Sequence, residues 1–110
     1  MAAYFLTNTP KELLTLFKKA IDDGHVATWS YDADGDFTHT ASQWKNLAWF
    51  RPSVESDRLK FNIVKPQNCQ VTDEIYAIYH GRIIESLLAH FDQKFTEGRA
   101  TAFAANGDVV

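Results

Sequence analysis

The feature that most constrains the fold is the stretch from Asp73 to Phe95, whose apolar residues recur at the spacing of an α-helix. Thr72 is a suitable N-cap for this helix, and Gly98 lies just past its other end. A helix of about 23 residues is about 35 Å long, whereas a domain of this size has a radius of gyration of about 13 Å. The predicted helix is therefore long beside the domain that contains it.

The apolar side of this helix is also wide. Covering one face of a sheet needs a stripe of about 100°, but the apolar side chains here cover about half of the helical cylinder. We therefore expect a second cover, either another helix of the same chain or another subunit. The residues of this apolar side are Tyr76, Tyr79, Ile83, Ile84, Leu87, Leu88, Phe91 and Phe95.

A first helix is predicted between Thr9 and Gly24. Thr9 is a natural N-cap, Pro10 suits the first helical position, and Glu12 completes a capping box. Gly24 is placed where a helix commonly ends in a glycine.

The segment between the two helices has the composition of β-strands, rich in β-branched and aromatic residues. Its four candidate strands are 25–31, 37–41, 46–52 and 58–65, and a short edge strand is possible at 100–104. The predicted fold class is α+β, a two-layer sandwich in which an antiparallel four-stranded sheet carries both helices on one face. The predicted order is α-β-β-β-β-α.

Composition indicates one domain and excludes several classes of partner. The chain has 110 residues, 45% of them hydrophobic, so we expect a single domain over 1–110, with 105–110 as a frayed tail. The net charge is −3 without a basic stripe, which argues against nucleic acid. No apolar run is long enough for a membrane span or a signal peptide, so we expect a cytoplasmic protein without membrane contact.

The stretch "YDADGDFTHT" resembles a calcium loop, because Asp32, Asp34 and Asp36 alternate around Gly35. A calcium loop that begins at Asp32 needs a bidentate glutamate at its twelfth position, which is Gln43 here. Asp-Ala-Asp-Gly between two strand-like runs is instead typical of a hairpin turn. We therefore favour a turn over a metal site.

The histidines give no metal site by spacing. The helical pair is ten residues apart, and zinc ligands on a helix are one turn apart. Cys69 is the lone cysteine, and no nucleophile or phosphate-binding motif is present. Asp36 and His39 are three apart on one short strand and hence point to opposite faces. We predict no catalytic residue, no metal and no cofactor.

Two surfaces remain as functional candidates. His80 lies within the apolar arc of the second helix, and a pocket between helix and sheet would bring together His80, Tyr76, Tyr79 and Trp29. On the sheet, Trp49, Phe50 and Arg51 have the composition of an interaction hot spot.

The leading hypothesis is a small non-enzymatic protein-interaction or regulatory domain. It would bind another protein or itself, as a homodimer, through the open sheet face or the long helix. The alternative is a small-ligand-binding or enzymatic domain with the pocket around His80.

Overall fold

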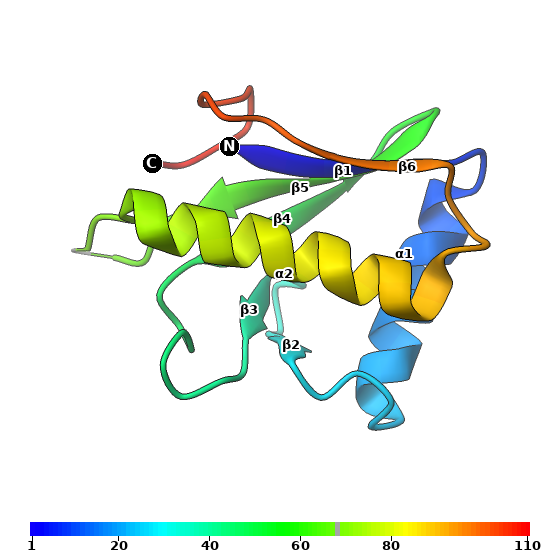
Figure 1. The fold of residues 1–110 in the computed structure, drawn as a ribbon, viewed down its shortest axis with the longest axis horizontal. Coiled ribbons are helices and arrows are strands. Elements are labelled where there is room, and N and C mark those ends of the chain that lie inside the picture. Colours follow the sequence, from blue (N-terminus) through cyan, green and yellow to red (C-terminus); the bar gives the residue numbers. More distant parts are fainter. Residues whose placement is uncertain (68) are drawn as a thin grey trace.

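A computed structural model describes residues 1–67 and 69–110. Its elements follow the order β-α-β-β-β-β-α-β (Figure 1). They are β1 (Ala2–Leu6), α1 (Pro10–Asp22), β2 (Trp29–Tyr31), β3 (Phe37–His39), β4 (Trp49–Val54), β5 (Arg58–Val64), α2 (Asp73–Phe91) and β6 (Glu97–Ala100). The α+β class, the antiparallel sheet and the two helices are confirmed, but the predictions of four strands and of the order α-β-β-β-β-α are wrong.

The sheet has six strands in the order β2-β3-β4-β5-β1-β6. The additional strand β1 lies between β5 and β6, and it pairs antiparallel with both of them. Its alternation is visible once the partners are known, because Ala3 and Phe5 are fully buried and Tyr4 is not. The short C-terminal strand forms at Glu97–Ala100, three residues before the predicted 100–104.

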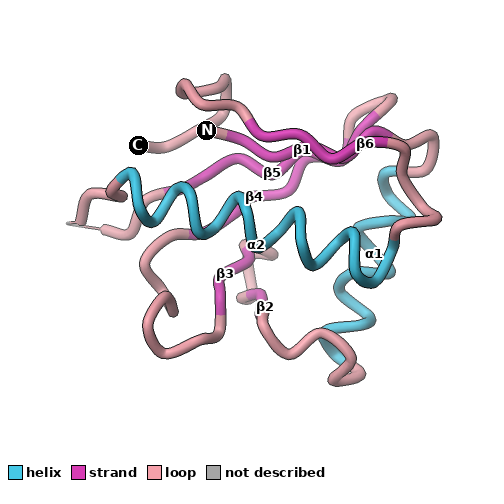
Figure 2. The backbone as a smooth tube through the Cα atoms, viewed as in Figure 1, coloured by secondary structure: helices cyan, strands magenta, loops and turns pink. Residues whose placement is uncertain are grey.

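Both helices pack on the same face of the sheet, so that helices and sheet form two layers (Figure 2). Phe17 of α1 stacks on Phe37 of β3 with ring centroids 5.0 Å apart, and it meets Phe61 of β5 at 6.3 Å. Phe17 also meets Phe91 of α2 at 6.3 Å. The wide apolar side of α2 is therefore covered partly by the sheet and partly by α1.

The helix ends agree with the sequence only in part. The Thr72 hydroxyl accepts a hydrogen bond from the Ile75 amide at 3.3 Å, as an N-cap does. At α1, Pro10 is the first helical residue, but in the described chain the Thr9 side chain makes no capping bond. Helix α2 ends at Phe91 rather than at the predicted 95, because the chain turns there to let Phe95 pack on Phe5 of β1, 5.1 Å away.

The C-terminal segment 105–110, predicted as a frayed tail, lies against β5 and is anchored there. The Asp108 carboxylate accepts hydrogen bonds from the Asn62 side-chain amide at 2.7 Å and from the Ala105 amide at 2.6 Å. Val109 donates to the carbonyl of Ile63 at 3.0 Å and continues the sheet beside Val64. Figure 1 shows the two chain ends close together on this side of the molecule.

Over the described ranges 1–67 and 69–110, neither helix has the length and apolar character that crossing a bilayer demands.

Candidate functional site

Strand β6 is one edge of the sheet, and its outer side carries free backbone groups. The β1–β6 register places Ala3 opposite Ala100 and Phe5 opposite Gly98. One step beyond, the Thr101 amide donates to the Ala2 carbonyl at 2.9 Å. Because bonded and non-bonded pairs alternate in an antiparallel ladder, Gly98 and Ala100 direct their amide and carbonyl groups away from β1. In the described part of the chain, no strand pairs with this outer side.

The side chains of β6 carry one charge of each sign. Glu97 and Arg99 are two residues apart, so both point to the sheet face that the helices leave open. The Arg99 guanidinium lies 3.1 Å from the Glu97 carboxylate, and both side chains are more than half exposed. Protected edge strands usually carry charges, often lysines, that discourage pairing with another strand. In β6 the negative charge of Glu97 and the positive charge of Arg99 offset each other, so this edge has little net charge to repel another strand.

Helix α2 runs beside β6 (Figure 1). On that side it carries a partly exposed stripe of small and apolar residues. At 100° per residue, the four positions fall within about 60° of one another. They are Ala77, Gly81, Ile84 and Leu88. The stripe lies next to β6, because the Cγ2 atom of Ile84 is 3.6 Å from the position that a Cβ atom on Gly98 would occupy. Leu88 is 51% exposed. A shallow hollow of about 280 Å³ lies over Gly81, and Ile78, Arg82 and Glu85 line its other side. The outer side of β6 and this stripe are called the β6–α2 surface below.

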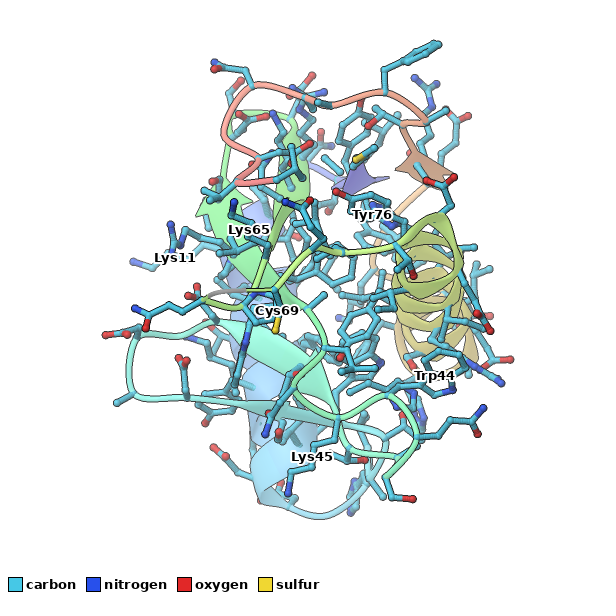
Figure 3. All side chains as sticks on the ribbon, turned by 90° about the vertical axis from the view of Figure 1, so that its left-hand side faces the viewer. Lys11, Trp44, Lys45, Lys65, Cys69 and Tyr76 are labelled. Carbon is cyan, nitrogen blue, oxygen red and sulfur yellow. The ribbon has the colours of Figure 1, made fainter. Side chains whose placement is uncertain are left out.

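A second hollow, of about 270 Å³, opens where α2 begins and β6 ends. It is lined by Met1, Tyr76, Ala77, His80 and residues 100–102. Tyr76 projects from α2 toward the sheet, below the C-terminal segment (Figure 3). Phe103 follows the lining residues directly and is 86% exposed. The hollow therefore continues the β6–α2 surface at one end.

His80 has one ring nitrogen without a partner. Its Nδ1 lies 2.7 Å from the Tyr76 carbonyl oxygen, so Nδ1 carries the proton and donates it. Nε2 is then an acceptor in the neutral ring, and in the described structure it is buried beside the Met1 backbone without a hydrogen bond. Burial lowers the pKa of His80 below its ordinary value, so the ring is neutral at pH 7.

The predicted group of four pocket residues divides into two pairs. Tyr76 and His80 line the hollow together, with ring centroids 6.3 Å apart. Trp29 and Tyr79 are fully buried in the core, where the Trp29 indole N–H donates to Ser86 Oγ at 3.0 Å. The Tyr79 hydroxyl donates to the carbonyl of Trp44, so neither of these two residues reaches the hollow.

The predicted interface residues lie at different depths. Phe50 is fully buried and contacts the His80 ring at a centroid distance of 5.1 Å, so it exposes no surface in the isolated chain. Trp49 is half-buried, and Arg51 is exposed. The Arg51 guanidinium donates to the Asp36 carboxylate at 3.1 Å, which raises the pKa of Arg51.

The aspartate-rich stretch is a turn between β2 and β3, as its sequence predicts. The Asp32 carboxylate accepts hydrogen bonds from the amides of Asp34 and Asp36, each at 3.0 Å, and Gly35 has a φ of 82°. Among the described residues, no three histidines, cysteines, aspartates or glutamates are grouped so as to hold a metal ion.

A larger hollow of about 500 Å³ lies where β1 passes into α1. It is formed by residues 6–9 and 93–96 together with Glu12 and Asp57. It is an open depression between turns, and His80 takes no part in it.

The long helix was predicted as a possible binding surface, but the free edge of β6 was not. Gly98 is expected only as a glycine beyond the helix, and Leu88 only as one of many apolar residues of α2. The exposed stripe repeats every three to four residues, which is a helical signal, but it merges with the wider apolar side. The chain matches no known protein family, no curated protein and no solved structure.

Proposed function

We propose that the chain is a non-enzymatic protein-interaction domain that binds its partner through the β6–α2 surface. The observation that carries this proposal is the outer side of β6, where Gly98 and Ala100 present backbone groups that nothing in the described chain uses. An added strand would bond to these groups, which is a common mode of protein recognition. We also propose that this domain acts in the cytoplasm.

The side chains around β6 support the same proposal. Leu88 lies half-exposed on the stripe of α2, and Phe103 is almost wholly exposed near the C-terminal end of β6. Large apolar and aromatic side chains at a surface are frequent anchors in interfaces. The hollow over Gly81 offers space for a side chain of the partner.

Site-specific cross-linking in cells tests this proposal. A photoreactive benzoylphenylalanine at position 88 should form a discrete cross-linked product, because Leu88 would lie in the interface. The matched control carries the same group at Leu47, which is 38% exposed in the loop between β3 and β4. Equal cross-linking from both positions, or none from position 88, would contradict the proposal.

The second candidate function is the binding of a small amphipathic ligand in the hollow around His80. The observation that favours it is the buried Nε2 of His80, a hydrogen-bond acceptor without a partner. A ligand with a hydroxyl or amide donor on a small apolar body would satisfy this nitrogen. The volume of about 270 Å³ lies just below the usual range for ligand pockets, so the ligand would be small.

Thermal unfolding with small probes tests the second candidate. Benzyl alcohol and benzamide should raise the Tm of the wild-type chain, because a ligand that binds only the folded state stabilises it. His80→Ala should remove that rise, since it removes the acceptor. A rise of the same size in the variant would contradict a site at His80.

A further inference from the structure

We propose that the partner at the β6–α2 surface is a second copy of this chain, joined to the first by antiparallel pairing of the two β6 strands about a two-fold axis at Gly98. This inference rests on the proposed function and adds the identity of the partner and the register of the pairing. Each copy would add its sheet to the other, and the two α2 helices would lie side by side beneath the joined strands.

The backbone of β6 permits this register. A two-fold axis at Gly98 places Gly98 of each copy opposite the other, and its amide and carbonyl already point outward. The two glycines would exchange both hydrogen bonds.

Charge complementarity selects this register among its neighbours. With Gly98 on the axis, Glu97 of each copy stands directly opposite Arg99 of the other, and this attraction occurs twice. A slip by two residues in one direction sets Arg99 against Arg99, and a slip in the other direction sets Glu97 against Glu97. A slip by one residue would bring inward-pointing backbone groups to the contact. The sequence of β6 is therefore complementary to itself in one register.

The flank of α2 is complementary to itself in the same way. Ile84 lies against Gly98 and hence near the axis, so the two helices cross it running in opposite directions. Leu88 lies one turn to one side of Ile84, and Gly81 lies one turn to the other side. Leu88 of each copy would then enter the hollow of about 280 Å³ over Gly81 of the other, where it would meet Ala77 and Ile78 beside the ion pair of Arg82 and Glu85. This contact adds apolar area to the short strand pair, as a stable dimer requires.

Charge reversal in β6 tests the register. Glu97→Arg gives a strand with two positive charges, and Arg99→Glu gives one with two negative charges. Each variant alone should weaken self-association by on the order of tenfold, because both cross-strand attractions become repulsions. A one-to-one mixture of the two variants should associate again, since the opposed charges then attract. Loss of folding cannot produce that recovery.

The measurement is sedimentation equilibrium of the wild type, the two variants and their mixture. The matched controls reverse Lys19 and Asp23, an exposed ion pair at the C-terminal end of α1 that lies outside the β6–α2 surface. These controls should associate like the wild type. A monomeric wild type, or variants whose mixture associates no better than either alone, would overturn the dimer. If position 88 still cross-links to a different protein, the proposed function stands and only the identity of the partner fails.

Discussion

At the scale of single residues, the core depends on a few buried polar contacts. The Tyr79 hydroxyl donates to the Trp44 carbonyl and lies 3.1 Å from Thr38 Oγ1, which ties α2 to the loop between β3 and β4. Tyr79→Phe should lower the free energy of unfolding by about 0.5–1.5 kcal/mol, because it removes the hydrogen bonds of this hydroxyl, while the Trp44 carbonyl keeps the Leu47 amide as a donor at 3.3 Å. Urea denaturation measures this change.

The matched control is Tyr31→Phe. The Tyr31 hydroxyl donates to the exposed Asp22 carboxylate at 2.7 Å, where water can replace it. This variant should lose much less stability than Tyr79→Phe. Equal losses of stability for the two variants would show that the hydrogen bonds of the Tyr79 hydroxyl do not stabilise the fold more than an exposed hydrogen bond does.

The buried histidines should make stability depend on pH. Burial lowers the pKa of His80 and of His39 in the folded state below the ordinary value of 6.5. The unfolded chain therefore binds protons first as the pH falls through this value, and the free energy of unfolding decreases. His80→Gln should reduce the decrease in stability between pH 7 and pH 5.

The control for this prediction is His25→Gln, at an exposed position after α1. Urea unfolding of each variant at several pH values gives the slope, which is separate from any general loss of stability. A His80→Gln slope identical to that of the wild type would contradict a titrating His80 in this range.

At the scale of elements, the sequence predicts those whose residues repeat strongly. Helix α2 was expected from its periodicity and cap, and β5 from the alternation of Leu59, Phe61 and Ile63. Strand β1 was missed because its sequence, Ala-Ala-Tyr-Phe-Leu, is apolar throughout and shows no alternation of polar and apolar residues. Strand β6 has the sequence Glu-Gly-Arg-Ala, which is poor in β-formers, so its pairing with β1 decides its structure.

The C-terminal segment is an element without regular structure, and Gly107 fits it to the sheet. Gly107 has a φ of +101°, and a Cβ there would lie 2.8 Å from Asn62 Oδ1. Gly107→Ala should therefore cost about 1–3 kcal/mol locally and release the segment. Amide hydrogen exchange should become faster at Val109 and at Lys65, whose amides bond across this contact.

Gly24→Ala is the control that distinguishes the close contact of a Cβ at position 107 with Asn62 from the strain of a positive φ. Gly24 also has a positive φ, of +80°, but a Cβ there would meet nothing within 4 Å. This control should leave exchange at Val109 and Lys65 unchanged. Unchanged exchange in Gly107→Ala as well would show that the segment does not depend on this contact.

At the scale of the whole molecule, the candidate site depends on neighbours that the sequence does not reveal. His80 and Tyr76 were predicted together because they are one turn apart on a single helix. Their separation from Trp29 and Tyr79 follows from Phe50, which fills the space between the two pairs. The free side of β6 exists only because β1 occupies the other side, and that pairing joins residues almost a full chain length apart.

At Gly81, a substitution should change the stability of one copy and the association of two copies in opposite directions. A glycine inside a helix destabilises it, and a Cβ at position 81 would meet nothing within 4 Å. Gly81→Gln should therefore raise the free energy of unfolding of the monomer by roughly 0.5 kcal/mol. The same side chain would fill the hollow that receives Leu88 of the second copy, and so weaken the dimer.

Ala89→Gln is the matched control, because it places the same side chain on the exposed face of α2 away from the stripe. It should change neither quantity appreciably. Urea unfolding at a concentration below the dimer range gives the stability of the monomer, and sedimentation gives the association. A Gly81→Gln chain that is more stable and also associates as well as the wild type would place the contact between copies elsewhere. General damage to the fold would lower the stability and the association together, so opposite changes identify an interface at Gly81.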